Sequence, residues 1–296
     1  MSDTRDGVIA GLIAYVLWGL LPIYFKAVVS VAPLELLMQR IIWAVPFGAL
    51  IILLRRQWPE VRRALAHRSM LLWLSTAALF VAVNWYIYIL AVQQEQIFQA
   101  SLGYYINPLL YVLAGVLLFG EKLRVGQISA VALATIGVLV LTFSGGQFPA
   151  LALAIGSSFT VYGVIRKRVV IGGMPGLFIE TLVLLPIAMV WLGWMANTSD
   201  IAFGSSIGMT GLLLLAGPVT VVPLLFFALA ARRLPLSTVG FMQFIAPTMQ
   251  FFVALYYGEV FTTAHLICFA CIWTAVLFFS ADALQQNRRR NSAPAT

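Results

Sequence analysis

The chain alternates long apolar runs with short polar connections. A helix that crosses the roughly 30 Å hydrocarbon core of a bilayer needs about twenty predominantly apolar residues. Ten runs of about that length cover residues 8–28, 34–54, 70–91, 99–119, 125–144, 149–165, 177–196, 207–229, 237–257 and 262–281. Their polar positions do not alternate with apolar ones, as they do in the strands of membrane barrels. The pattern predicts an all-α polytopic membrane protein with ten transmembrane helices.

The composition supports a lipid environment for these helices. Hydrophobic residues make up 62% of the 296 residues and charged residues only 9%, whereas average proteins carry about 25% charged residues. A chain with so little polar surface cannot cover itself against water and needs lipid as its solvent. The first run contains Pro22 and is longer than the apolar core of a signal peptide, so we interpret it as a retained helix.

The formal net charge of +8 is distributed unevenly along the chain. With an inside N-terminus and ten crossings, the outer loops hold Glu95, Asp200 and Glu259 and no lysine or arginine. The inner segments hold Arg5, Arg55, Arg56, Arg62, Arg63, Arg68, Lys122, Arg124, Arg166, Lys167, Arg168, Arg232, Arg233, Arg288, Arg289 and Arg290. This asymmetry follows the positive-inside rule and predicts that both termini are cytoplasmic. Since short basic clusters between apolar runs are typical of inner loops, we predict no nucleic-acid binding.

Two stretches of the chain contain the same kinds of residue in the same order. Small residues, a mid-helix proline and a terminal Gly-Glu recur as Ser101, Gly103, Asn107, Pro108, Gly120 and Glu121, and as Ser237, Gly240, Ala246, Pro247, Gly258 and Glu259. Arg40 and Pro46 correspond to Glu180 and Pro186 at an offset of 140 residues, and Trp18-Gly19 resembles Tyr162-Gly163. We therefore predict two five-helix repeats, at residues 1–146 and 147–285, followed by a basic cytoplasmic tail at 286–296.

The odd number of helices in each repeat has a consequence for its orientation. The second repeat enters the membrane from the opposite side, which gives an inverted repeat with an axis in the membrane plane. Such repeats are typical of secondary transporters, whose binding site lies near the bilayer midplane and opens to one side and then to the other. The predicted function is therefore the transport of a small organic molecule by alternating access.

Prolines lie inside several of the predicted helices. Each removes a backbone hydrogen bond and frees the carbonyl one turn earlier, which favours a kink. A freed carbonyl in lipid must be received by protein or by a water-filled cavity. We predict kinks around a central cavity, although prolines also occur in membrane helices for packing reasons. The positions are Pro22, Pro46, Pro108, Pro186, Pro223 and Pro247.

Two of the charged residues within the apolar runs are candidates for a binding site. Arg40 and Glu180 occupy matching places in the two repeats, and charges in membrane helices usually face a cavity or a partner. Because the two helices run in opposite directions, Arg40 belongs toward the outer side and Glu180 toward the inner side. Arg40 has the chemistry to attract an anionic group of a substrate, and Glu180 to bind an ammonium group or carry a proton. The alternatives are an Arg40 that snorkels outward and a Glu180 that pairs with an inner arginine.

Amides and aromatic rings supply the remaining candidates for substrate binding. Asn84 and Trp85 lie in mid-helix, Tyr104 and Asn107 precede Pro108, and Gln243 precedes Pro247. Such groups are suited to a pocket for a small amphipathic molecule. The same groups also join helices to one another or anchor them at the membrane interface, and the sequence leaves both interpretations open.

Other motifs favour structure over chemistry. Cys268 and Cys271 have C-x-x-C spacing after His265, which keeps a membrane redox enzyme as an alternative, beside a non-transporting receptor. Packing of these side chains within a membrane helix is the preferred interpretation. Gly126, Ala130 and Ala134 form a small-residue face for close packing within the chain or in a homodimer. Phosphate-loop and hydrolase motifs are missing from the sequence, so we predict no cofactor, metal or catalysis.

The chain resembles the EamA-type permeases of the drug/metabolite transporter superfamily. The stretches that carry the resemblance are YVLWGLLPIYFK (15–26), QRIIWA (39–44), NWYIYILAV (84–92), ASLGYYINPL (100–109), YGVIRK (162–167), IETLVLLP (179–186), STVGFMQFIAPT (237–248) and YGE (257–259). The resemblance implies two inverted repeats in a bacterial inner membrane and the export or exchange of small metabolites or drug-like molecules. It also implies a pocket between the halves, faced by Trp18, Arg40, Asn84, Tyr104, Asn107, Tyr162 and Glu180.

Overall fold

All regular elements of the described chain are α-helices, which confirms the all-α prediction. The computed structural model describes residues 2–120, 125–144, 146, 148–198, 201–234, 238–239 and 242–291. Its helices are α1 (Ser2–Gly19), α2 (Leu21–Ala27), α3 (Pro33–Leu54), α4 (Trp58–Ala66), α5 (Arg68–Gln93), α6 (Ile97–Phe119), α7 (Val125–Phe143), α8 (Ala150–Lys167), α9 (Gly173–Thr198), α10 (Ile207–Leu214), α11 (Ala216–Arg233), α13 (Ile245–Tyr256) and α14 (Thr263–Asn291). Glu121, Ser237 and Gly240 of the predicted repeat, the loop residues Lys122, Arg124 and Asp200, and the last five residues of the tail lie outside the described residues.

Seven helical spans of the described chain are long and apolar enough to cross a membrane. They are Thr4–Ala27, Pro33–Leu54, Arg68–Gln93, Ile97–Leu117, Val125–Phe143, Gly173–Thr198 and Ile207–Arg233, and two shorter apolar helices cover Ile245–Tyr256 and Thr263–Phe278. The predicted segment at α8 is not among the seven, and Arg166 and Lys167 in its last turn lower its mean hydropathy. The protein is a polytopic all-α membrane protein.

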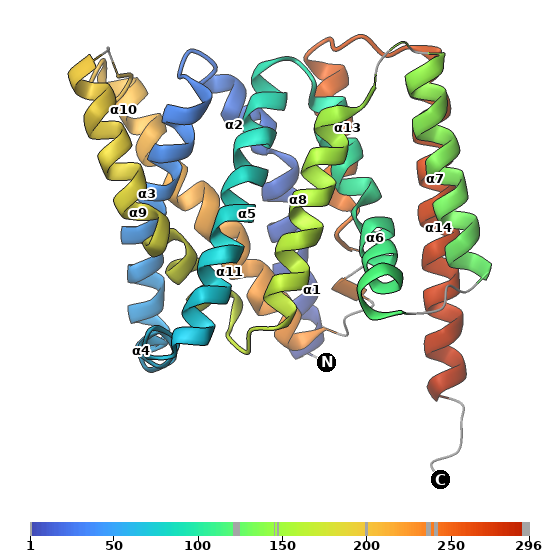
Figure 1. The fold of residues 1–296 in the computed structure, drawn as a ribbon, viewed down its shortest axis with the longest axis horizontal. Coiled ribbons are helices and arrows are strands. Elements are labelled where there is room, and N and C mark those ends of the chain that lie inside the picture. Colours follow the sequence, from blue (N-terminus) through green and yellow to red (C-terminus); the bar gives the residue numbers. More distant parts are fainter. Residues whose placement is uncertain are drawn as a thin grey trace.

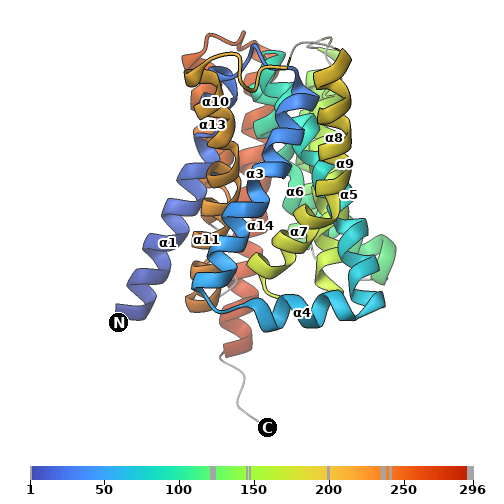
Figure 2. The same cartoon turned by 90° about the vertical axis from the view of Figure 1, so that its left-hand side faces the viewer.

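The long helices run alternately up and down in one bundle, and α4 lies across one end of it (Figures 1 and 2). The apolar pattern predicted only a connection between membrane helices for this segment. In the structure, α4 buries Val61 and Ala64 while Arg62 and Arg63 remain exposed. An amphipathic helix of this kind lies along the end of a bundle because each of its two faces meets a different environment. α1 begins and α14 ends at this same end of the bundle (Figure 1).

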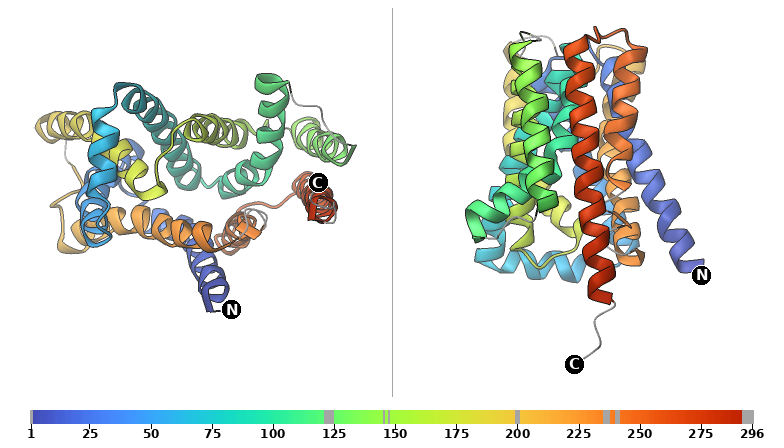
Figure 3. Two further views of the ribbon diagram at one scale, coloured as in Figure 1. Left: turned by 90° about the horizontal axis from the view of Figure 1, so that it is seen from below. Right: turned by 90° about the vertical axis from the view of Figure 1, so that its right-hand side faces the viewer.

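Helices from the two halves of the sequence are interleaved in the bundle (Figure 3). α1 packs against α11 and α13, α3 packs against α9 and α11, and α8 packs against α5 and α6. α7 and α14 form a pair at one edge, where they contact each other far more than any other helix. The two predicted repeats are therefore not separate bodies, and most of the packing joins one to the other.

The small-residue face of α7 packs within the chain. Ala130 and Ala134 are buried, and a Cβ atom on Gly137 would lie 3.0 Å from both the carbonyl oxygen of Cys268 and the Cβ atom of Cys271 on α14. The close approach of α7 and α14 thus depends on these small side chains. Of the two alternatives that the sequence left open for this face, the structure shows packing within the chain.

The prolines occupy two kinds of position. Pro46, Pro108, Pro186 and Pro223 lie inside α3, α6, α9 and α11, whereas Pro22 and Pro247 lie in the first turns of α2 and α13. At Pro22 the carbonyl one turn earlier, that of Trp18, accepts a hydrogen bond of 3.1 Å from Nε2 of Gln250. A side chain of the other half, rather than a cavity, therefore receives the carbonyl that this proline frees.

Candidate functional site

Arg40 is a buried cation at the contact of α3, α5 and α11. Its side chain is only 5% exposed, and its Nε donates a hydrogen bond of 2.7 Å to Oγ1 of Thr220 on α11. The guanidinium carbon lies 4.1 Å from the ring centroid of Trp85 on α5 and 5.7 Å from that of Phe25 on α2. Among the described residues it has no acidic partner. Arg40 therefore does not snorkel outward, and it lies between elements of both halves.

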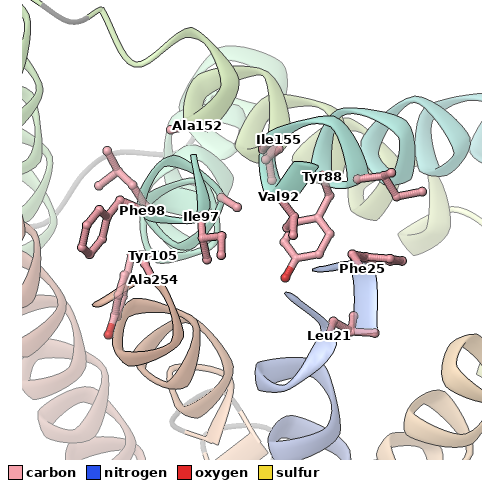
Figure 4. Packing of buried hydrophobic residues seen from close by; sticks show 14 of the residues in the cluster. Leu21, Phe25, Tyr88, Val92, Ile97, Phe98, Tyr105, Ala152, Ile155 and Ala254 are labelled. Carbon is pink, nitrogen blue, oxygen red and sulfur yellow. The ribbon is translucent and has the colours of Figure 1, made fainter. Parts of the chain in front are cut away.

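Aromatic side chains extend from Arg40 toward α6. The ring of Tyr88 lies 5.8 Å from that of Phe25 and 5.6 Å from that of Tyr104. Figure 4 shows Tyr88 reaching from α5 toward Phe25 and Leu21 of α2, with its hydroxyl directed away from α5. This hydroxyl is buried and makes no hydrogen bond within the described structure. The region around Arg40 therefore combines apolar ring surfaces with an unused polar group.

Asn84 joins α5 to α8. Its Nδ2 donates to the carbonyl oxygen of Ile155 at 2.9 Å and to Oγ of Ser158 at 3.1 Å. Its Oδ1 accepts a hydrogen bond of 3.3 Å from the hydroxyl of Tyr104 on α6. The amide group is 1% exposed and fully engaged by protein, so in this conformation it acts as a connection between helices.

Asn107 makes a second link of the same kind. Its Oδ1 accepts a hydrogen bond of 2.8 Å from Oγ1 of Thr160 on α8. The two asparagines were predicted from the sequence, but their partners, Ser158 and Thr160, were not. The signal was present, because the hydroxyl residues of SSFT (157–160) interrupt an otherwise apolar run, and buried hydroxyls in lipid need partners.

Glu180 is fully buried and paired on the inner side of the bundle. Its Oε1 lies 3.4 Å from Nε of Arg166, and its Oε2 accepts a hydrogen bond of 3.2 Å from the hydroxyl of Tyr162. The pairing with an inner arginine, which the sequence offered as one alternative, is the arrangement in the structure. Glu180 and Arg40 belong to separate clusters, since each has different partners.

Two further candidates lie away from Arg40. The ring of Trp18 packs against Tyr15 and Phe227, at centroid distances of 5.4 and 5.7 Å. Gln243 lies in the turn before α13, and its half-buried side chain makes no hydrogen bond among the described residues. The described contacts join neither of them to Arg40. Substrate binding by these two residues stays a prediction from sequence.

The cysteines form a packing contact. Both thiols are free, Cys268 is buried and Cys271 half-buried, and the backbone of Cys268 and the Cβ atom of Cys271 lie against Gly137 of α7. His265 is hydrogen bonded to Thr262, whose Oγ1 lies 2.8 Å from Nδ1 of the imidazole. No group of three or more metal-ligating side chains is found among the described residues.

A bundle of apolar helices that holds a few polar clusters in its interior defines a class, the polytopic membrane proteins with intramembrane sites. A family model for EamA-like transporters matches residues 5–143. An uncharacterised transporter of Vibrio cholerae serotype O1 is 45% identical over 288 residues, which cover 96% of this chain and 95% of that protein. The protein RarD of Salmonella typhi is 40% identical over 291 residues, covering 98% of this chain and 99% of that protein.

The fold itself is shared with a known structure. A crystal structure superposes with a TM-score of 0.61 at 18% identity and covers 93% of this chain and 96% of that chain. The chain belongs to the EamA-like transporter family. Within it, the chain is a permease of the drug/metabolite transporter superfamily that is similar to RarD over nearly its full length.

Proposed function

We propose that this protein is a secondary transporter that moves small organic molecules across a bacterial inner membrane by alternating access, in the direction of export. The transporter relatives in bacteria support the class, and the apolar helices support the membrane location. The bundle would cross the membrane ten times. α1–α2 and α10–α11 would each form one crossing and are among the seven long spans. The helices α8, α13 and α14 would add three crossings to these seven. An even number agrees with the position of the first and last helix ends on one side, the proposed cytoplasmic side (Figure 1).

The packing supports an inverted repeat. The proposed counterparts are α1–α2 with α8, α3 with α9, α5 with α10–α11, α6 with α13 and α7 with α14. If each helix is replaced by its counterpart, every contact between two helices predicts a second contact. The α1–α11 contact predicts α8–α5, the α6–α8 contact predicts α13–α1, and the α3–α11 contact predicts α9–α5. All three predicted contacts occur in the structure. The remaining principal contacts, α3–α9, α6–α13 and α7–α14, pair each helix with its own counterpart. This exchange symmetry is the observation that carries the proposal.

The repeated Gly-Glu landmark has the same backbone role in both halves. Gly120 caps the end of α6 with φ +65°, and Gly258 follows the end of α13 with φ +77°. Both values lie in the left-handed region, which glycine adopts without steric cost at a helix C-terminus. Two equivalent helices that end in the same conformation are the expected result of a duplicated unit.

The contacts between the halves differ at the two ends of the bundle. At the end opposite the termini, the Glu259 carboxylate accepts hydrogen bonds from the backbone amides of Ile97 and Phe98, at 2.6 and 3.0 Å. The hydroxyl of Tyr24 donates to the carbonyl oxygen of Leu212 at 3.0 Å at this end as well. These bonds hold the outer end closed.

At the end that carries the termini, Oε1 of Glu60 accepts a hydrogen bond of 2.7 Å from the backbone amide of Gly172, but like charges from the two halves also face each other there. Burial and the nearby guanidinium groups of Arg232 and Arg233 lower the pKa of Arg55. Repulsion between α3 and α11 favours separation of the halves there. A molecule bound between the halves would then be released to one side or to the other as these two ends open in turn.

Flux measurements in sealed proteoliposomes test the proposal. Purified protein should allow solutes from a panel of small metabolites to cross the membrane down an imposed gradient and without ATP. Protein-free vesicles give the background leak. Proteoliposomes that match this background for the whole panel, with the protein verified as folded and inserted, would contradict transport.

A further inference from the structure

We infer that Arg40 binds the carboxylate of an organic monoanion, whose apolar or aromatic body lies on the rings around it. This inference rests on the proposed function and names the class of molecule for the same site. It begins with the unused bonding capacity of the guanidinium. The Nε–H group of Arg40 donates a hydrogen bond to Thr220. The four N–H groups on its two terminal nitrogens have no hydrogen-bond partner among the described residues. Two parallel N–H groups match the two oxygens of a carboxylate.

The guanidinium is fixed in place before any ligand arrives. The hydroxyl of Thr220 donates to the carbonyl oxygen of Ala216 at 2.8 Å, so its lone pairs face the Nε of Arg40. One face of the guanidinium stacks on Trp85. These contacts fix the plane of the guanidinium and use only Nε as a donor, so the terminal N–H groups keep a defined orientation for an anion.

A second unpartnered polar group lies near the same rings. Tyr88 is 2% exposed, and its hydroxyl has no hydrogen-bond partner in the described structure. Its ring packs against Phe25, which the guanidinium of Arg40 also approaches. The Tyr88 hydroxyl has no partner in the described part of the chain, and the guanidinium of Arg40 has donors beyond its bond to Thr220, so one ligand with several acceptor atoms would satisfy both groups.

The charge balance of the surroundings limits the ligand to a single negative charge. Lys26 lies 3.5 Å from Glu95 at the outer end, and Glu180 is held by Arg166 and Tyr162. Arg40 is therefore the single positive charge available to a molecule bound there, within the part of the chain that is described. A dianion would keep one charge uncompensated. An ammonium group would have to displace the existing contacts of Glu180, or those of the buried Glu35 on α3, whose Oε1 accepts a hydrogen bond of 2.8 Å from the backbone amide of Ala202.

Four related probes distinguish these possibilities, with binding measured by calorimetry in nanodiscs. They are 3-phenylpropanoate, its neutral amide 3-phenylpropanamide, phenylalanine, which adds an ammonium group, and phenyl phosphate, which adds a second charge. We expect 3-phenylpropanoate to bind about tenfold or more tightly than each of the other three, as a charge-assisted bidentate pair implies. Equal affinity for the acid and its amide, or no measurable binding of the acid, would overturn the inference.

Substitutions place the binding at Arg40. Arg40→Gln should weaken 3-phenylpropanoate binding about tenfold or more and change the amide little. Arg40→Lys keeps the positive charge but lacks the two parallel N–H groups of the guanidinium, so it should lose less affinity for 3-phenylpropanoate than Arg40→Gln. This variant tests the inference if Arg40→Gln does not fold. The matched control is Arg168→Gln, because Arg168 also lies over a tryptophan ring, at 5.3 Å from Trp73, but is exposed at the inner end. Unchanged acid binding in both Arg40 variants would overturn the assignment.

The outcome separates this inference from the transport proposal. Selective binding of the acid without flux in proteoliposomes would retain the site and reject transport. Flux of uncharged solutes without selectivity for the acid would retain transport and reject the carboxylate site.

Discussion

At the residue scale, the polar side chains in these helices have two different uses. Asn84, Asn107 and Glu180 are engaged by protein partners, whereas Arg40 keeps unused donors. The sequence located all four, because a polar residue in a long apolar run is conspicuous and costly in lipid. It could not assign their uses, because each partner is on a helix that is distant in sequence. The partner decides whether a polar group connects helices or binds a ligand.

Replacement of Asn84 tests its role as a connection. Asn84→Ala removes both donors and one acceptor and leaves the Tyr104 hydroxyl without its partner. We expect the free energy of unfolding to fall by about 1–3 kcal/mol, measured by SDS titration in mixed micelles. Asn197→Ala is the matched control, since Asn197 is exposed and bonds only to the Gly193 carbonyl oxygen of its own helix. An equal loss in the two variants would refute the connecting role.

The pair of Glu180 and Arg166 is suited to a double-mutant cycle. Glu180→Gln leaves Arg166 without its buried counter-charge, and we expect a loss of about 3 kcal/mol in the free energy of unfolding. Arg166→Gln should cost a similar amount, while the double variant should lose clearly less than the sum of the two. Additive losses would mean that the two charges do not interact.

At the scale of elements, periodicity predicted the existence of the helices better than their interruptions. Each of the ten apolar runs overlaps at least one helix of the described chain, but the breaks at Leu20 and Leu215 do not show in the apolar pattern. A break needs only a change at one or two residues and leaves the hydropathy of the run unaltered. α4 was missed for the opposite reason, since nine residues with an amphipathic pattern are too short for a search for membrane spans.

The Glu259 carboxylate holds the N-terminus of α6, and its titration should be visible in stability. Burial raises the pKa of Glu259 above its ordinary value near 4.5. The two backbone amides and Lys26 lower this pKa, and Glu95 raises it, but the effect of burial is the largest. The folded protein therefore binds this proton more tightly than the unfolded chain does. The stability contributed by Glu259 should fall as the pH rises from about 4.5 through the raised pKa.

Comparison with Glu259→Gln isolates this effect, because glutamine does not titrate. The free energy of unfolding of the variant, relative to the original protein, should increase across that pH window and level off above it. Glu95→Gln removes an exposed carboxylate whose raising effect on the pKa of Glu259 is the smallest of these effects, so it should narrow the pH window without removing it. A difference between the Glu259→Gln variant and the original protein that does not change with pH would contradict the assignment.

At the scale of the whole molecule, duplication could be predicted from the sequence, and interleaving could not. The landmarks around Pro108 and Pro247, and the offset between Arg40 and Glu180, indicated two related units. Linear landmarks contain no information on which helices of the two units touch. That choice is made by the packing of small and large side chains, such as Gly137 against the cysteines of α14.

The proposed alternation requires the outer ends of the two halves to separate. Lys26 of the first half lies over the ring of Tyr257 of the second, at 5.6 Å from its centroid. Cysteines at these two positions, in a background with Cys268→Ala and Cys271→Ser, can be joined by a short thiol-cleavable cross-linker. The link should abolish flux in proteoliposomes, and its reduction should restore flux, because a tied outer end cannot open. The same background without the pair should transport normally if the native thiols only pack.

A second cysteine pair provides the control for this experiment. Lys26 also lies 3.5 Å from Glu95, which belongs to the same half. A link between cysteines at positions 26 and 95 adds the same reagent at the same end without joining the two halves, so flux should persist. Undiminished flux through protein that is linked between positions 26 and 257 would show that the halves do not part there. Loss of flux with both pairs would point to local damage at position 26, so only a loss confined to the pair that spans the halves supports alternating access.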